Sequence, residues 1–183
     1  MRIIAITPPT FFEGEASFIR SLLANGFELV HLRKPDASLQ ECRKLLQELS
    51  EEERAKIIIH DYPELFEEFS LKGIHINRRV TSPPDGYRGF KTYSCHSLEE
   101  IQQHKEDFDY LFLSPIFDSI SKAGYKAAFT EDELRRASDE GIIDHRVVAL
   151  GGITPDKLPF LEKMNFGGAA MMGGLYSMLK PNH

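Results

Sequence analysis

The sequence contains only two cysteines and no tryptophan in 183 residues. Cys42 and Cys95 show no paired spacing, so nothing indicates a disulfide framework or a zinc motif, and a reduced, cytoplasmic protein is expected. No apolar run approaches the roughly eighteen residues that span a bilayer. The N-terminal segment predicts a first strand rather than a signal peptide.

Positive charge is also scarce, because 22 Lys and Arg stand against 28 Asp and Glu, which gives a formal net charge of −6. This balance argues against general binding of nucleic acid or of an anionic membrane surface. Any site for a small anion must therefore be local and built from a few cations and backbone N–H groups. A homo-oligomer is possible, because the sequence does not determine the oligomeric state.

Apolar segments alternate with helical patterns along the chain, which is long enough for one sizeable core. Such alternation predicts a parallel sheet, and eight short strands with short crossovers favour a closed barrel. We therefore predict an α/β fold, a small (β/α)₈ TIM barrel that forms a single domain over residues 1–183, with an open doubly wound sheet as the alternative. The predicted strands are Arg2–Thr7, Glu28–Arg33, Ile57–His60, Ile74–Asn77, Lys91–Ser94, Tyr110–Ser114, Val147–Leu150 and a segment from Gly168.

Helix signals stand between most of these strands. Residues 78–90 show no helical period, so we expect the fourth helix to be missing and the helix layer to be thin. Gly26, Gly73 and Gly141 are expected to end three helices. The predicted helices span Glu15–Asn25, the segment behind the capping box Ser38–Glu41, Pro63–Leu71, the segment from the capping box at Ser97 to Lys105, and the segment from Thr130 to Gly141.

Two similar segments near the end of the chain each combine a buried strand with a glycine pair. After Val147–Leu150 and its glycines, Thr154 is a predicted N-cap and Pro155 takes the first helical position. Bare backbone N–H groups ahead of a helix attract an anion, and two such units are typical of the phosphate site after strands 7 and 8 of a barrel. Two tight turns that pack a helix onto the sheet are the alternative. The predicted phosphate-binding residues are Gly151, Gly152, Met172 and Gly173.

Polar residues end or follow most of the predicted strands, where a barrel of this type carries its active site. His31 and Arg33 share a face because side chains alternate along a strand, and a guanidinium matches phosphate oxygens. A solvated charge is the alternative for Arg33, and Lys34 is expected to point elsewhere. The candidates at strand ends are Thr7, His31, Arg33, His60, Asp61, Asn77, Ser94 and Ser114.

The loop of residues 115–129 carries two hydroxyls and an ammonium close together, at Ser119, Ser121 and Lys122. Long loops in compact domains are commonly lids or binding loops. Because hydroxyls and an ammonium suit phosphoryl oxygens, we predict a loop that orders over a diphosphate. A plain polar loop is the alternative.

Four histidines, His31, His60, His75 and His96, lie in or just after consecutive strands. Together with Asp61 they would suit a divalent hydrolytic metal at the mouth of a barrel. The chain has no H-x-H or H-x-x-x-H pair, however, and strand alternation places His75 below the strand end. A metallohydrolase is therefore the less favoured hypothesis.

Several short stretches, in this order and spacing, resemble the thiamine phosphate synthase family and its thiazole tautomerase relatives. They are Val30–Lys34, Ile59–Asp61, Gly73–Ile76, Ser114–Phe117, Ser119–Lys122, Leu150–Thr154 and Met172–Gly173. The resemblance implies a (β/α)₈ barrel and a transferase of thiamine biosynthesis. Such an enzyme couples hydroxymethylpyrimidine diphosphate to a thiazole phosphate and releases diphosphate.

The resemblance also implies roles for individual residues. His60 stands where the family has an asparagine that binds the pyrimidine, and His31 replaces a glutamine. The implied catalytic residues are Arg33, Lys122, Ser119 and Ser121, the implied substrate-binding residues are His31, His60, Ser94, Gly151, Gly152, Met172 and Gly173, and the implied metal ligand is Asp61.

The chain departs from the family pattern where a second magnesium carboxylate is expected, because residues 77–80 hold no acid. A single carboxylate binds Mg²⁺ poorly, so weak or substrate-dependent Mg²⁺ is expected, with Arg78 or Arg79 as an electrostatic substitute. The alternative functions are a tautomerase-like enzyme and a non-catalytic regulatory barrel. The tautomerase relatives share a histidine with His31, but use another where this chain has Pro115.

Overall fold

The computed structural model describes residues 1–118 and 126–172. Eight strands are hydrogen-bonded in chain order as a closed barrel, and the pairs that define their register are parallel. The predicted (β/α)₈ fold is confirmed. Contacts divide the chain into two compact units, residues 4–92 and residues 1–3 with 93 onward, so a single domain over the whole chain stays a prediction.

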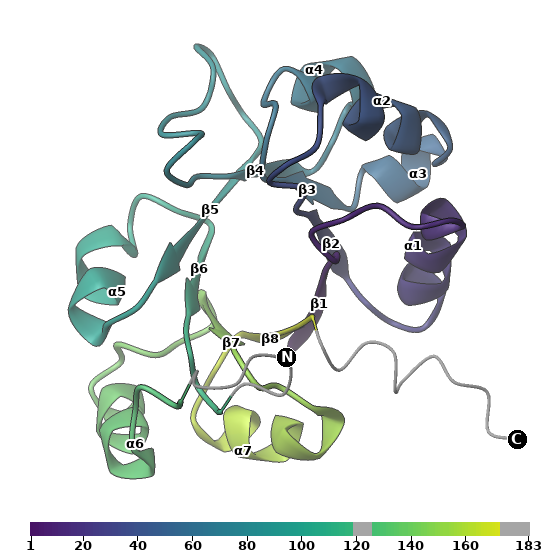
Figure 1. Ribbon diagram of the computed structural model, residues 1–183. Coiled ribbons are helices and arrows are strands. Elements are labelled where there is room, and N and C mark those ends of the chain that lie inside the picture. The colour runs from purple at the N-terminus through teal and green to yellow at the C-terminus, as the bar shows by residue number, and fades with distance from the viewer. Residues whose placement is uncertain (119–125, 173–183) are drawn as a thin grey trace, which may run out of the picture. The chain divides into compact units, whose positions relative to one another are not determined.

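The unit of residues 4–92 holds most of the first five strands, with helices α1 to α4 on their outer side (Figure 1). The strands Leu29–Leu32 and Ile57–Ile59 are short, fully buried and mainly aliphatic, which is typical of a parallel sheet covered on both faces. The register pairs Ile6 with His31 and Leu32 with Ile59. The elements are β1 (Arg2–Ile6), α1 (Glu15–Ala24), β2 (Leu29–Leu32), α2 (Leu39–Gln47), α3 (Glu51–Arg54), β3 (Ile57–Ile59), α4 (Leu65–Phe69), β4 (Gly73–His75) and β5 (Phe90–Cys95).

The second unit continues the alternation of strands and helices. Its register pairs Leu113 with Ala149 and Leu150 with Ala170. Among the described residues, no helix combines the length and the apolar character that a bilayer span requires. The elements are α5 (Leu98–His104), β6 (Tyr110–Leu113), α6 (Glu131–Asp139), β7 (Val147–Leu150), the 3₁₀ turn η1 (Pro155–Lys157), α7 (Leu158–Lys163) and β8 (Gly168–Met171).

The helix starts follow the local signals closely. Ser38 and Thr130 each form the predicted reciprocal capping box. Ser97 also accepts a hydrogen bond from the Glu100 backbone, but the Glu100 carboxylate accepts from the N–H of His96 rather than from Ser97. The capping box predicted there is therefore only half formed.

The prediction that Gly73 ends a helix is wrong, because Gly73 is the first residue of β4. The helix α4 ends instead at Ser70, which adopts a left-handed conformation with φ 51°. A Cβ atom on Gly73 would lie 2.3 Å from the carbonyl oxygen of Phe90. The glycine is required because β4 and β5 approach each other closely, a cause that lies far along the chain.

The helix layer is thin where the sequence predicts it. Residues 76–89, all of which the structure describes, contain no helix. After β7, the chain enters α7 through a 3₁₀ turn, and the Thr154 side chain makes no capping hydrogen bond. The predicted helix start at Pro155 is thus confirmed in position, but the N-cap bond expected of Thr154 is absent.

Candidate functional site

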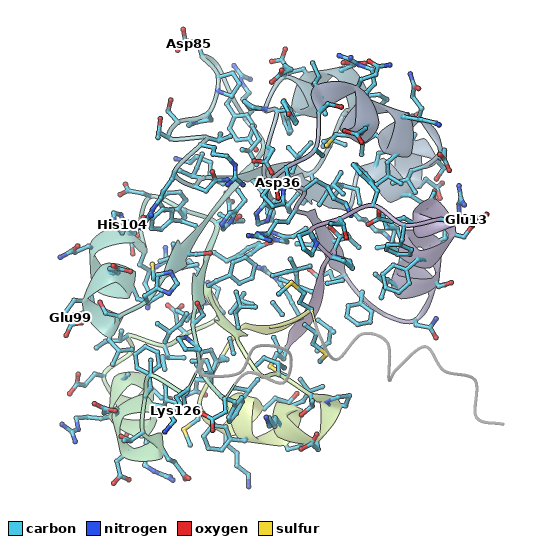
Figure 2. All side chains as sticks on the ribbon, in the orientation of Figure 1. Glu13, Asp36, Asp85, Glu99, His104 and Lys126 are labelled. Atoms are coloured by element: carbon cyan, nitrogen blue, oxygen red, sulfur yellow. The ribbon has the colours of Figure 1, made fainter. Side chains whose placement is uncertain are left out.

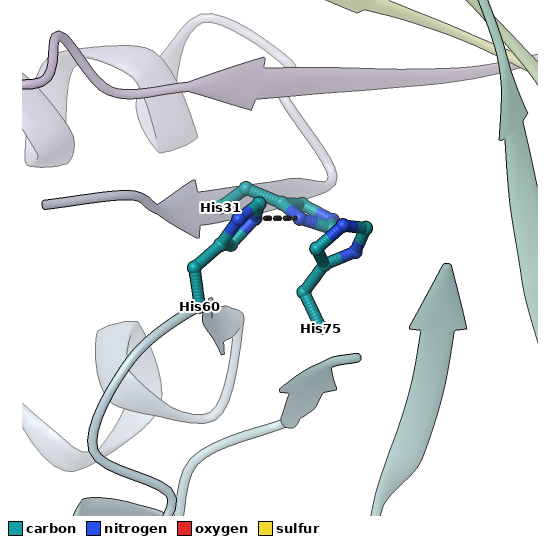
Figure 3. A group of neighbouring side chains, drawn as sticks. All are labelled: His31, His60 and His75. Atoms are coloured by element: carbon teal, nitrogen blue, oxygen red, sulfur yellow. Dashed lines mark hydrogen bonds between the residues drawn. The ribbon is translucent and has the colours of Figure 1, made fainter. Parts of the chain in front are cut away.

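Three imidazoles, from His31 in β2, His60 after β3 and His75 at the end of β4, form a histidine cluster (Figure 3). A hydrogen bond of 2.8 Å joins His31 Nδ1 and His60 Nε2, and the His60 and His75 rings stack with centroids 4.1 Å apart. His75 Nδ1 also lies 2.8 Å from the hydroxyl of buried Thr92. The expectation that His75 lies below the strand end is wrong, because β4 is shorter than predicted and ends at His75 itself.

The histidine cluster is buried, with His31 fully enclosed. Burial lowers the pKa of His31 and of His60 well below the ordinary value. Burial, with a smaller effect from the charge of Arg33, lowers the pKa of His75 to about 3. The three rings are therefore uncharged at neutral pH and offer hydrogen-bonding nitrogens without net charge.

Arg33 follows β2, and its positive charge contributes to the lowered pKa of both His60 and His75. Its backbone N–H donates to Thr7 Oγ1 at 3.1 Å, which holds the ends of β1 and β2 together. The residue is half-buried, and it forms no ion pair with any described residue. Its guanidinium is thus a cation beside neutral rings, a suitable arrangement for an anionic group.

Lys34 points away from Arg33, as expected, and is only 1% exposed. Its ammonium donates to Glu15 Oε1 at 2.6 Å and to the backbone oxygens of Pro8 and Thr10. Burial raises the pKa of Glu15 and lowers the pKa of Lys34, while the bond between them opposes both shifts. Lys34 therefore fastens the loop after β1 and is not a group for substrate.

Asp61 is buried beside the histidine cluster and pairs with an arginine. Its Oδ1 accepts from Arg79 Nε at 2.6 Å, while its Oδ2 is buried without a hydrogen-bond partner among the described residues. Asn77 organises this corner, because its amide nitrogen donates to the carbonyls of His60 and His75 and its oxygen accepts from the Arg79 N–H. The sequence indicates Asn77 and Arg79 as candidates one by one, whereas the hydrogen bond between them depends on the turn after β4.

In the other unit, Gly151 and Gly152 turn the chain after β7 with φ values of 96° and 63°. A Cβ atom would lie 2.9 Å from Pro115 at the first position and 2.2 Å from the carbonyl oxygen of Asp118 at the second. The amides of both glycines donate to no described residue. Lys157, which sequence reasoning missed, donates to the carbonyl oxygen of Gly152 at 2.6 Å and brings a cation to the turn.

The remaining candidates are distributed between described and undescribed parts of the chain. Ser94 lies half-buried in β5, and Met172 lies half-buried directly after β8. His96 is not part of the histidine cluster, since its Nδ1 lies 3.1 Å from the carbonyl oxygen and 3.3 Å from the hydroxyl of Ser114. Ser119, Ser121, Lys122 and Gly173 lie outside the described residues.

Comparison with known proteins gives consistent matches. A family model described as thiamine monophosphate synthase matches residues 3–175. A thiamine-phosphate synthase of Lactococcus lactis is 29% identical over 140 residues, which is 72% of this chain and 63% of that protein. One of Actinobacillus succinogenes is 30% identical over 137 residues, which is 70% of this chain and 61% of that protein. The matched part therefore spans just over three fifths of these two relatives.

Solved structures agree with these matches. A thiamine phosphate pyrophosphorylase from Bacteroides thetaiotaomicron has a TM-score of 0.88 and 39% identity, covering 100% of this chain and 88% of that chain. A thiamine phosphate pyrophosphorylase from Pyrococcus furiosus has a TM-score of 0.72 and 21% identity, covering 93% of this chain and 85% of that chain. The second likeness supports the fold alone.

Proposed function

This chain belongs to the thiamine monophosphate synthase family, and from that membership we propose that it couples hydroxymethylpyrimidine diphosphate to thiazole phosphate and releases diphosphate. The family match over residues 3–175 carries the proposal. The relatives named above are synthases, which favours this function over a thiazole tautomerase or a non-catalytic regulatory barrel. The buried, uncharged histidine cluster and the adjacent arginine support it further.

The proposed reaction breaks the carbon–oxygen bond between the pyrimidine methylene group and diphosphate. The electron pair leaves with the diphosphate, and the thiazole nitrogen supplies the pair for the new carbon–nitrogen bond. Arg33 would stabilise the charge that develops on the leaving group, and we assign the same role to Lys122, Ser119 and Ser121. The reaction needs no protein nucleophile, because the thiazole nitrogen attacks.

We assign the pyrimidine to the histidine cluster, and the substrate-binding role that the family resemblance gives Ser94 stays a prediction. A pyrimidine is uncharged and carries ring nitrogens and an amino group, so it is best recognised by hydrogen bonds from neutral groups. The lowered pKa of His31 and of His60 keeps both rings in that neutral state. Arg33 next to them would take the diphosphate of the same substrate.

We assign the phosphate of the thiazole substrate to the backbone of Gly151, Gly152, Met172 and Gly173. The two glycine amides that donate to no described residue support this assignment, as does the nearby ammonium of Lys157. Backbone N–H groups bind phosphate oxygens well when no side chain stands in front of them. Both glycine positions exclude a side chain through close contact with the loop at residues 115–118.

The proposed activity is tested by incubating the full chain with both substrates and quantifying thiamine phosphate and diphosphate. We expect the two products to appear in a 1:1 ratio and only when both substrates are present. If thiazole phosphate binds but no product forms, the chain is a non-catalytic member of the family. A change in the thiazole compound alone, without diphosphate release, would indicate a tautomerase.

Replacing Gly152 with alanine is expected to weaken thiazole phosphate binding by about tenfold, or roughly 1.4 kcal/mol. The new Cβ atom would meet the Asp118 carbonyl oxygen at 2.2 Å, so the turn must shift and its amides must move. Calorimetric titration with thiazole phosphate measures the effect. The control is Gly141→Ala, which imposes similar backbone strain at φ 71° with no atom within 4 Å. Equal losses in both variants would contradict the assignment.

The residues beside the histidine cluster do not fit a resident magnesium ion. The family resemblance assigns Mg²⁺ to one described carboxylate at this place, Asp61. That carboxylate already forms an ion pair with Arg79. Of the two Asp61 oxygens, Oδ2 has no hydrogen-bond partner among the described residues. Mg²⁺ keeps its water molecules unless several oxygens are offered together. We therefore propose that any Mg²⁺ binds weakly and only with diphosphate, which itself provides oxygens.

The Arg79→Met variant tests this proposal, because it releases Asp61 Oδ1 from its guanidinium partner. We expect Mg²⁺ affinity, measured by calorimetry in the presence of diphosphate, to rise several-fold in the variant, on the order of 1 kcal/mol. Arg78→Met is the matched control, since Arg78 is exposed and adjacent in sequence, and it should change nothing. Tight Mg²⁺ binding to the unmodified protein without diphosphate would contradict the proposal.

Small phosphorylated molecules are the partners that this function requires. A reduced, cytoplasmic setting stays a prediction, to which Cys42 and Cys95 lend support as buried free thiols.

A further inference from the structure

The histidine cluster has the chemistry of a metal site as well as that of a hydrogen-bonding site. Its three ring nitrogens, one from each of His31, His60 and His75, all lie within 4.8 Å of one another. Each residue stands at or near the carboxyl end of a different strand, β2, β3 or β4, and all belong to one compact unit. Figure 3 shows the three rings side by side, with the hydrogen bond between His31 and His60.

The separation of one pair of ring nitrogens can be compared directly with the separation around a bound ion, and the stacked rings of His60 and His75 would also have to turn for both to bind one ion. Zinc binds imidazole nitrogen at about 2.0–2.1 Å, so two ligands in a tetrahedral site lie about 3.3 Å apart. The 2.8 Å separation of His31 Nδ1 and His60 Nε2 is shorter, because a shared proton joins them. For one ion to bind both nitrogens, the proton of the donating ring must move to the other nitrogen of that ring, and the two rings must separate by about 0.5 Å, a small side-chain rotation.

The state and support of the rings also suit a metal. Metals bind the uncharged imidazole, and burial keeps all three rings uncharged through their lowered pKa values. The bond between His75 Nδ1 and Thr92 Oγ1 fixes one ring in the manner of an outer-shell partner.

We propose that His31, His60 and His75 together form a binding site for one borderline transition-metal ion, Zn²⁺, Co²⁺ or Ni²⁺, with its fourth position open. Three imidazole donors select these ions over Mg²⁺, which prefers oxygen. The positive charges of Arg33 and Arg79 act on the cluster, so affinity should be weaker than in a closed structural zinc site. The site is thus distinct from any magnesium that diphosphate brings to Asp61.

The test is a titration of the chelator-treated full chain with Co²⁺, with no phosphorylated substrate present. We expect one equivalent to produce the visible absorption of four-coordinate Co²⁺, and Zn²⁺ but not excess Mg²⁺ to abolish it. His31→Gln and His60→Asn retain hydrogen-bonding side chains of similar size, and each should weaken Co²⁺ binding by at least about tenfold. His145→Gln removes an exposed histidine and should leave the titration unchanged.

Absence of the absorption in the unmodified protein, or its retention in both cluster variants, would overturn the proposal. If a cluster variant does not fold, ring-nitrogen NMR of the unmodified protein during Zn²⁺ titration decides the question. Shifts confined to three histidines that include the hydrogen-bonded pair His31 and His60 support the site. Shifts at exposed histidines alone refute it. Because no substrate is used, the outcome is independent of the synthase assay.

Discussion

Replacing Lys34 with methionine is expected to lower the free energy of unfolding by about 3–5 kcal/mol. The Lys34 ammonium and the Glu15 carboxylate are both buried and lie 2.6 Å apart. Removing the cation leaves a buried carboxylate whose second oxygen already lacks a partner among the described residues. Urea unfolding followed by circular dichroism measures the change, and the melting temperature should fall on the order of 10 °C.

Two further variants separate the buried pair from a general effect of losing a positive charge. The double change Glu15→Gln with Lys34→Met should recover most of the loss, because no buried charge is then left unpaired. Arg135→Met breaks an ion pair with Glu131 in which both side chains are 59% exposed, and it should have almost no effect. If Lys34→Met behaves like Arg135→Met, the buried ion pair does not stabilise the loop after β1.

Replacing Lys122 with alanine is expected to lower kcat of the proposed synthase by about 10²–10³-fold. We assign Lys122 to the departing diphosphate, where negative charge grows as the carbon–oxygen bond breaks. The dissociation constant for thiazole phosphate should stay within about twofold, because that substrate carries no leaving group. Single-turnover rates and calorimetric titration measure the two quantities separately.

The matched control for this variant is Lys126→Ala, which removes an exposed lysine of the same segment (Figure 2). It should change neither the rate nor the affinity. An equal loss of thiazole phosphate affinity in Lys122→Ala, or an unchanged rate, would show that Lys122 does not contact the leaving group.

The elements that the sequence predicts well are those with causes close along the chain. The run Ile57–Ile59 predicts a buried strand because its residues are all apolar and β-branched. Ser38 and Thr130 predict helix starts because a capping box needs only a residue three positions ahead. The glycine pair after β7 marks the turn correctly, because a positive φ favours glycine wherever it occurs.

One error has a cause that lies far along the chain, and the other two features depend on local geometry that the sequence pattern leaves open. Gly73 serves a close approach to the backbone of Phe90, and nothing in its local sequence announces that contact. The half-formed capping box at Ser97 arises because the Glu100 carboxylate finds another N–H, that of His96. Lys157 reaches the carbonyl oxygen of Gly152 only because the helix after β7 begins with a 3₁₀ turn.

The sequence by itself determined the alternation of strands and helices, the family resemblance and the list of polar residues at strand ends. Only the tertiary structure decided which of those residues meet. His31, His60 and His75 come together because β2, β3 and β4 are neighbours that end near one level, and Asp61 meets Arg79 through the turn that Asn77 holds. Local patterns depend on residues within a few positions, whereas these contacts depend on strand register and turn geometry, which the packing of the whole unit sets.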